Sequence, residues 1–274
     1  LALVCALSII HSAQFYRLFH RHITNWEDHL DSTRQKMTDS LPKNASVIAT
    51  FEFLNELSNR KELYPLYYVY RGENAFTQKD FLVAPPDIDY ALVDFEDPWV
   101  YYLAAGNYLE VNKNLQKFFL NSDWKVHKAV ENIVLLKKSK NTGTPLVSVT
   151  RNPPDTDYPL ENIGLSVSGH FTLLKYKLGD NENTDSRLLP VTLLWKSLSD
   201  VKNRYALRFG VESENGKLLF MRTHEIGYTI YPTFVWKKGE YVLEKYWLST
   251  PKLKSCNYKI VAALYDATVN KVAS

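Results

Sequence analysis

Residues 205–221 have the sequence YALRFGVESENGKLLFM, which predicts a β-hairpin. Its first part, YALRFGV, partly alternates apolar and polar side chains, as a strand with one buried face does. Asn215-Gly216 follows, a pair typical of a type I′ turn, because both central residues of that turn need positive φ. The apolar residues LLFM then return as the partner strand. We therefore expect antiparallel β-structure in this part of the chain.

Further stretches of the C-terminal half have the same character. Strands are predicted at 188–195, 241–248 and 258–265, and turn signals such as Lys238-Gly239 separate them. Short strands at this spacing, divided by Gly, Asn and Pro, are typical of a β-sandwich or a jelly roll. Residues 160–274 are therefore expected to form a β-sandwich domain.

Residues 141–159 interrupt the pattern. This segment is rich in residues that favour turns and loops, namely Asn141, Thr142, Gly143, Pro145, Pro153, Pro154, Asp155 and Pro159. Such a cluster between two patterned regions is typical of a domain boundary. We expect a linker here.

Residues 42–140 combine strand and helix signals. Strands are expected at 46–50, within 60–70 and at 89–94, with helices at 51–59 and from Pro98 to about 121. A closing hairpin is expected at 124–136, with its turn near Glu131-Asn132. Strands and helices in this order predict a small α/β domain.

The N-terminal residues LALVCALSII are apolar, but a bilayer-spanning helix takes about 20 residues. They fit the end of a truncated transmembrane helix, and a buried core helix is the alternative. Apolar side chains recur at helical spacing from Phe15 to Met37, so an amphipathic connecting helix is expected up to residue 41. The chain would then contact membrane lipid through this helix at the cell membrane, with residues after about 25 on the extracytoplasmic side.

Composition excludes several classes of function. The sequence has 33 basic and 30 acidic residues, a net charge of +3, so no broad basic field favours a nucleic-acid partner. Its two cysteines, Cys5 and Cys256, are too few for a disulfide scaffold or a Cys-rich zinc site. The GxGxxG, Walker, HExxH and GxSxG motifs are missing. We therefore predict no catalytic residue, metal site or cofactor.

An acidic group follows the predicted strand at 89–94. Asp94, Glu96 and Asp97 lie where α/β sheets often bind ligands, at the end of a strand. Calcium or sugar hydroxyls would suit these carboxylates. The alternative is a solvated loop in which Asp97 caps the helix that begins at Pro98.

Two other groups of residues are candidates for ligand binding. Asn59 and Arg60 either fix a loop through hydrogen bonds or face a phosphate. Trp195 and Trp236, together with Trp247 and Tyr231, either form an aromatic platform for a glycan or fill the sandwich core, since tryptophan serves both purposes.

Three short motifs in the α/β segment carry a resemblance. They are LPKNASV (41–47), LSNRKELY (57–64) and DYALVD (89–94). The pattern resembles soluble segments that follow the last membrane helix of predicted bacterial and archaeal membrane proteins of unknown function. Those proteins are similar to GT-C type glycosyltransferases, and their segment ends where the hairpin at 124–136 lies here.

A second set of motifs resembles the C-terminal β-sandwich of such membrane proteins. VTLLWKSL (191–198), YPT (231–233), WKKGE (236–240), Tyr258 and LYD (264–266) follow one another in the same order. RTHEI (222–226) and Ser255-Cys256-Asn257 depart from the pattern, which bears on ligand binding and not on the fold.

The resemblance implies a full-length enzyme that moves a sugar from a polyprenyl-phosphate carrier, with its catalytic carboxylates in an early loop outside this chain. The chain would be its non-catalytic extracytoplasmic C-terminal portion, supporting acceptor or partner binding, with a glycan or lipid-linked sugar as a partner. The alternative is a membrane-tethered carbohydrate-binding or adhesion module. Both interpretations expect an α+β fold.

Overall fold

The computed structural model describes residues 28–83, 86–96, 108–120, 123–140, 143–155, 160–167, 169–179, 188–216, 218–250, 258–267 and 271–272. Contacts divide the chain into two compact units, Leu1–Leu41 and Pro42–Ser274. The predicted membrane helix at residues 1–10 lies outside the described residues. Among the helices that the structure describes, none is long and apolar enough to cross a membrane.

In the first unit, the described part is helix α2 (Asp28–Asp39). Its end is fixed by local hydrogen bonds: the Ser40 hydroxyl donates to the Met37 carbonyl at 2.8 Å, and the Leu41 N–H donates to Thr38. Pro42 follows and could not continue a helix, because it has no N–H to donate. The connecting helix predicted up to residue 41 is therefore present in its described part.

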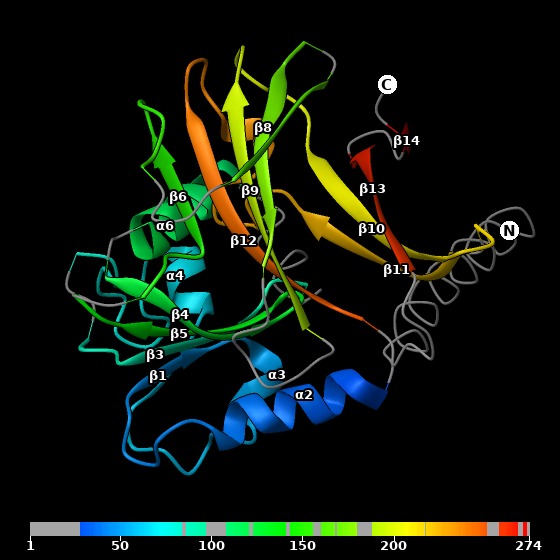
Figure 1. Cartoon of the computed structure of the whole chain (residues 1–274). Helices are drawn as coiled ribbons and strands as arrows, with labels where there is room; N and C mark the ends of the chain where they lie inside the picture. Colours follow the sequence, from blue (N-terminus) through cyan, green and yellow to red (C-terminus); the bar gives the residue numbers. More distant parts are fainter. Residues whose placement is uncertain are drawn as a thin grey trace, which may run out of the picture. The chain divides into compact units, whose positions relative to one another are not determined.

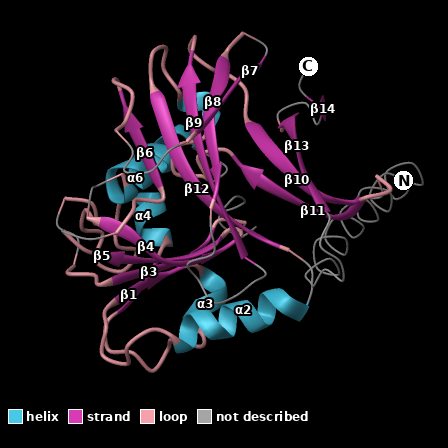
Figure 2. Ribbon diagram, viewed as in Figure 1, coloured by secondary structure: helices cyan, strands magenta, loops and turns pink. Residues whose placement is uncertain are grey.

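The second unit contains one mixed sheet with short helices and two antiparallel sheets (Figures 1 and 2). The mixed sheet and its helices comprise β1 (Val47–Ala49), α3 (Phe51–Leu54), β2 (Leu63–Pro65), α4 (Tyr67–Arg71), β3 (Tyr90–Asp94), α6 (Tyr108–Phe119), β4 (Trp124–Val130) and β5 (Ile133–Lys138). The remaining strands are β6 (Val147–Thr150), β7 (Glu161–Val167), β8 (Phe171–Leu178), β9 (Leu188–Ser197), β10 (Tyr205–Ser213), β11 (Leu218–Glu225), β12 (Tyr241–Ser249), β13 (Tyr258–Asp266) and β14 (Lys271–Val272), with a 3₁₀ turn at Thr233–Val235.

The mixed sheet has the strand order β2-β1-β3-β5-β4. Strand β1 pairs in parallel with β2 and β3, whereas β5 is antiparallel to both β3 and β4. The central strands β1 and β3 are buried along their whole length, as in sheets covered on both faces. This explains why the apolar runs at 47–49 and 90–94 do not alternate with polar residues.

Side chains from the three α/β motifs bond to one another at the start of this sheet. The carboxylate of Asp89 accepts hydrogen bonds from the Ser46 hydroxyl at 2.9 Å and from the Ser46 N–H at 3.0 Å. Nη1 of Arg60 donates to the carbonyls of Pro42, Lys43 and Ala45. The loop that leads into β1 is therefore held by residues from both other motifs.

The two antiparallel sheets have the strand orders β6-β12-β9-β8-β7 and β11-β10-β13-β14. Aromatic rings from the facing sides of the two sheets pack against one another. The ring centres of Phe171 (β8) and Tyr205 (β10) lie 5.0 Å apart, and Phe209 (β10) stacks on Tyr246 (β12) with ring centres 5.5 Å apart. Two antiparallel sheets that share an apolar interior form a β-sandwich. The predicted α+β fold with a sandwich is confirmed.

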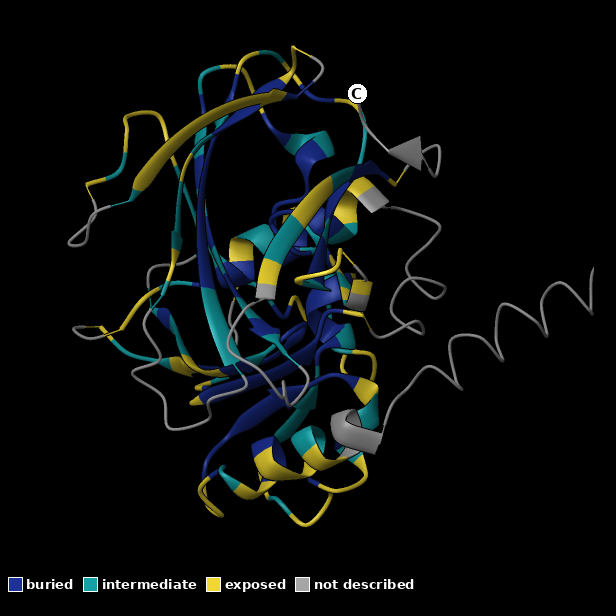
Figure 3. Ribbon diagram, turned by 45° about the vertical axis from the view of Figure 1, so that its right-hand side comes forward, coloured by how far each residue is buried: buried dark blue, intermediate teal, exposed yellow. Residues whose placement is uncertain are grey.

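One continuous hydrophobic core runs through the mixed sheet and the sandwich (dark blue in Figure 3). It includes Ala91 and Val134 of the mixed sheet and Phe171, Trp195 and Val242 of the sandwich. The compact unit Pro42–Ser274 accordingly covers both predicted domains. A division at 140 and 160 stays a prediction, although β6 forms within the expected linker and pairs with β12.

Several element boundaries differ from the sequence expectation. The helix expected at 51–59 is α3, which ends at Leu54 and continues as turns. The strand expected within 60–70 is only β2, after which the chain turns into α4 and ends that helix at Gly72 with φ +73°. Tyr- and Leu-rich segments fit a half-buried helix or strand equally well, so pattern alone could not divide this segment. The 131–132 turn lies where expected. The chain also turns at 213–216, where the Gly216 N–H donates to the Ser213 carbonyl at 2.9 Å. Gly216 has positive φ but Asn215 does not, so the expected type I′ turn with Asn215-Gly216 at its centre is wrong.

Replacing Arg60 tests the bonds between motifs. Arg60→Ala removes the donor to three carbonyls and should lower the free energy of unfolding by about 1 kcal/mol, since the side chain is only partly buried. Denaturant unfolding measures this, and Lys61→Ala at the exposed neighbouring position is the control. Equal stabilities of the two variants would contradict the assigned role of Arg60.

Candidate functional site

Carboxylates from two segments meet where β3 ends and the β4–β5 hairpin turns. Asp94 and Glu96 come from the end of β3, and Glu131-Asn132 form the turn. The Asn132 side-chain amide donates to Glu96 Oε1 at 2.6 Å, and the Glu96 N–H donates to Asp94 Oδ1 at 2.9 Å. The Phe95 N–H donates to the Asn132 carbonyl, so backbone bonds hold the two segments together. We call Asp94, Glu96, Glu131 and Asn132 the junction cluster, together with Arg222 of β11, which pairs with Glu131.

Glu131 connects the junction cluster to the sandwich. It adopts φ +54°, which is uncommon for a residue other than glycine. Its N–H donates to the Trp247 carbonyl of β12 at 2.7 Å, and its Oε1 lies 2.8 Å from Nε of Arg222 on β11. Both side chains of this ion pair are largely buried, with exposed fractions of 7% and 19%. A buried carboxylate needs such a charged partner.

Negative charge exceeds positive charge in the junction cluster. The pKa of Glu96 is raised to about 8, first because its carboxyl is desolvated and then because the charges of Asp94 and Glu131 oppose its ionisation. Arg222 and the bond from Asn132 act in the opposite direction. Glu96 as a whole residue is exposed, so solvent screens part of this effect.

A second polar group, the Glu244 group, lies wholly inside the sandwich. Glu244 on β12 accepts hydrogen bonds from Trp195 Nε1 at 2.8 Å and from the Gly227 N–H at 2.6 Å. His224 Nε2 lies 3.1 Å from Glu244 Oε2, the oxygen that also accepts from Gly227. The side chains of His224 and Glu244 have no exposed surface. A buried carboxylate with three donors is well satisfied, so this group fixes β9, β11 and β12 against one another.

Tyr246 lies between these two groups. Its ring is 4.2 Å from the ring of His224, and the pKa of its hydroxyl is raised well above the usual value, by burial first and then by Glu131 and Glu96. Within the described residues, the Tyr246 hydroxyl and His224 Nδ1 are buried without a hydrogen-bond partner. Tyr246 thus contacts the Glu244 group through the His224 ring, while the charges of the junction cluster act on its hydroxyl.

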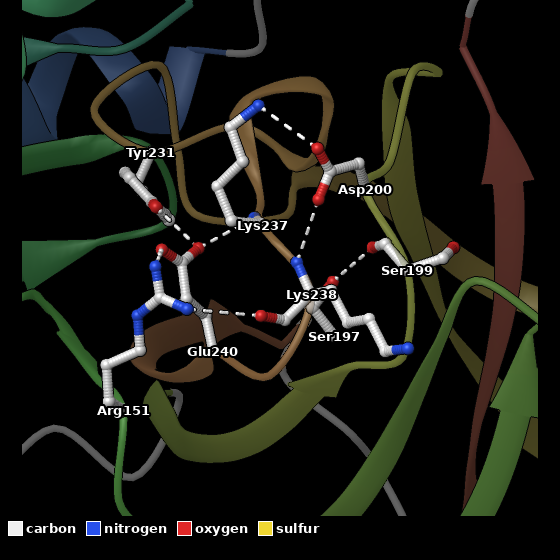
Figure 4. A network of polar contacts seen from close by, with 8 residues as sticks. All are labelled: Arg151, Ser197, Ser199, Asp200, Tyr231, Lys237, Lys238 and Glu240. Carbon is white, nitrogen blue, oxygen red and sulfur yellow. Dashed lines mark hydrogen bonds and ion pairs between the residues drawn. The ribbon is translucent and has the colours of Figure 1, made fainter.

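A third network stabilises the loops at the opposite end of β9 and β12 (Figure 4). The buried Glu240 carboxylate accepts from the Tyr231 hydroxyl at 2.7 Å and from the Lys237 N–H at 2.8 Å, and Arg151 lies 3.7 Å away. Asp200 accepts from the Lys238 N–H at 3.0 Å. These carboxylates bind backbone N–H groups of one turn, which indicates a structural role.

The structure brings together only some of the predicted ligand residues. Asp94 and Glu96 are adjacent, while Asp97 lies outside the described residues. Asn59 is exposed, and Arg60 binds backbone carbonyls. The Trp195 and Trp236 rings lie 6.4 Å apart, but they expose 1% and 0% of their surface. Both indoles therefore fill the core, and neither has a free face on which a sugar could stack.

Sequence reasoning missed the partners contributed by distant segments. Glu131 was expected only as a turn residue, and His224 only as part of the segment RTHEI that departs from the motif pattern. One signal was present: in YVLEKYWL, Glu244 lies on the same strand face as Val242 and Tyr246, where an apolar residue is expected. A charged residue on the buried face of a strand indicates a paired interior group.

The junction cluster does not have the geometry of a metal site. Among the residues that the structure describes, no three His, Cys, Asp or Glu side chains converge in a way that could hold a metal ion. The calcium interpretation of Asp94 and Glu96 therefore gains no support from the described residues.

Comparisons with known proteins give no family. No protein-family model matches the chain, and no curated protein matches it. Chicken MD-1 in complex with lipid IVa is 16% identical with a TM-score of 0.23, covering 43% of this chain and 93% of its own. A Niemann-Pick type C2 protein from Japanese carpenter ant is 17% identical with a TM-score of 0.25, covering 42% and 93%. Bacteroides uniformis β-glucuronidase 2 is 16% identical with a TM-score of 0.26, covering 52% of this chain and 14% of the enzyme. At these scores the similarities carry no argument about function.

Glu96→Gln tests the electrostatics of the junction cluster. The pKa of Glu96 is higher in the folded protein than its ordinary 4.5, so the folded state binds this proton more tightly. The free energy of unfolding should therefore fall as pH rises from 4.5 towards 8. Glu96→Gln, which imitates the protonated carboxyl, should weaken this fall. Urea unfolding at pH 5, 7 and 9 measures the effect, and identical pH profiles for both proteins would refute it.

Gly227→Ala tests the packing around the Glu244 group. A Cβ at Gly227 would lie 2.1 Å from the Tyr231 carbonyl oxygen, whereas a Cβ at Gly239 would meet nothing within 4 Å. Both glycines have positive φ, at +74° and +85°, so both variants bear similar backbone strain. Gly227→Ala should therefore unfold more easily than Gly239→Ala by about 2–4 kcal/mol. Thermal or denaturant unfolding decides, and equal destabilisation would exclude the steric explanation.

Proposed function

We propose that the chain is the non-catalytic extracytoplasmic portion of a membrane protein that resembles polyprenyl-phosphate-sugar-dependent glycosyltransferases. In this proposal, the N-terminal segment tethers the chain to lipid. The unit Pro42–Ser274 then acts as a rigid support that presents a binding surface to an acceptor or a partner.

The bonding between the three α/β motifs carries this proposal. Each motif is short and would arise often by chance. Asp89 binds Ser46, and Arg60 binds the carbonyls of the loop before β1, so the three motifs depend on one another physically. A set of interdependent residues is a more specific signature than three separate matches. This supports the resemblance to soluble segments that follow a last membrane helix.

The polar clusters favour a structural role for this unit over a catalytic role. Glu131 is bound to Arg222, and Glu244 is bound to Trp195 and Gly227. A carboxylate bound this way inside the protein is not available to a substrate, and it stabilises the arrangement of strands instead. The alternative of a carbohydrate-binding module would require a surface other than Trp195 and Trp236, because both rings are buried.

Cysteine labelling in whole cells tests the proposed location. The complete gene, with Cys5 and Cys256 replaced by Ser, is expressed carrying Asn215→Cys in the exposed β10–β11 turn. A membrane-impermeant maleimide should label this cysteine in intact cells, and the protein should sediment with membranes. Ser197→Cys, at a position with no exposed surface, is the matched control and should react only after denaturation.

Two results would overturn the proposal. Labelling of Asn215→Cys only after the cells are permeabilised would place the turn on the cytoplasmic side. Recovery of the complete protein in the soluble fraction would remove the membrane attachment altogether.

A further inference from the structure

One face of the mixed sheet carries a group of basic side chains on two neighbouring strands, β4 and β5. Lys137 of β5 is directly opposite Tyr90 of β3 on one side and Lys125 of β4 on the other. Directly opposed residues of antiparallel strands point to the same face of the sheet. Tyr90, Lys137 and Lys125 therefore form one row across the sheet.

His127 and Lys128 extend this row along β4. The ring of His127 contacts the ring of Tyr90 at 6.1 Å, and the Lys137 ammonium lies 5.7 Å from the Tyr90 ring centre. A bulge between Val126 and Lys128 inserts His127 as an extra residue in β4. Bulges redirect side chains, and here His127 and Lys128 both gather beside Lys137. We call Lys125, His127, Lys128 and Lys137 the basic row.

The positive charges of the basic row are not balanced by carboxylates. Lys125 and Lys137 are like charges directly opposite each other, an arrangement that destabilises a sheet. In the part of the chain that the structure describes, Lys125, Lys128 and Lys137 make no ion pair. The neighbouring Lys138 does, with its Nζ 4.0 Å from Asp87 Oδ1. The pKa of His127 is lowered by burial first and then by Lys128 and Lys137, and no carboxylate offsets this effect.

The size of the basic row suits a compact anion. Neighbouring strands are about 4.8 Å apart, so ammonium groups on β4 and β5 can reach the same anion. Lysine binds phosphate well as a point charge, and histidine adds a donor when it is protonated. His127, Lys128 and Lys137 are exposed and Lys125 is half-buried, so a ligand can reach these side chains at the edge of the sheet.

We propose that Lys125, His127, Lys128 and Lys137 form a binding site for the phosphate group of a small ligand. The site does not depend on the membrane location proposed above, because it stands on residues of β3, β4 and β5 alone. The phosphate would relieve the repulsion between the opposed lysines and stabilise the edge of the mixed sheet.

Titration of His127 by NMR tests the site. Inorganic phosphate or pyrophosphate is added to the folded chain at constant ionic strength, with chloride as the comparison. Binding should be saturable and should raise the pKa of His127, because the anion offsets Lys128 and Lys137. Lys125→Gln/Lys137→Gln should weaken binding at least tenfold. Lys113→Gln/Lys117→Gln, on exposed positions of α6, removes the same charge and should leave binding unchanged.

Three results would overturn the proposal. The first is that phosphate and pyrophosphate have no more effect than chloride. The second is equal loss of binding in the two double variants, which would indicate a general charge effect. The third is binding to phosphatidylglycerol vesicles, but not to phosphatidylcholine vesicles or to either soluble anion, which would indicate an extended membrane contact. Unfolding midpoints of both double variants show whether each is folded before binding is measured.

Discussion

Glu131 connects the mixed sheet to both sheets of the sandwich. Its N–H binds the Trp247 carbonyl of β12, and its carboxylate pairs with Arg222 of β11. One residue in a tight turn thus contacts both sheets of the sandwich, at the cost of positive φ. The junction cluster follows from this placement, and so does part of the electrostatic effect on Glu96.

Such buried ion pairs are costly to form, because desolvation offsets most of the attraction. Apolar residues of similar volume would hold the two layers together as well or better. The ion pair adds specificity, because Arg222 can reach Glu131 in only one register of β11. Likewise, Glu244 accepts hydrogen bonds from Gly227 and Trp195 in only one arrangement of the strands. We infer that these groups select a single packing of mixed sheet on sandwich.

The sequence allowed the fold to be predicted where local signals are strong. Asn215-Gly216 requires a tight turn, and apolar runs such as 90–94 require burial on both faces. It did not allow prediction of the clusters, because Glu96 and Asn132 or Glu131 and Arg222 meet only through tertiary packing across 36 and 91 residues. Helix α4 was also missed, since a few aromatic residues suit a helix or a strand equally well. Glu244 could have been found from its phase in the strand alone.

The three polar clusters and the basic row differ in how far the protein satisfies them itself. Glu240 and Glu244 accept hydrogen bonds from the backbone and from neighbouring side chains, so their carboxylates are satisfied within the fold. Lys125 and Lys137 face each other on a sheet and lie outside any ion pair in the described residues. Arg222 neutralises a buried carboxylate, whereas the opposed lysines have only the Tyr90 ring close to the Lys137 ammonium and no carboxylate partner among the described residues. Compensation from outside, by an anion, is the physical explanation that requires no further change to the protein.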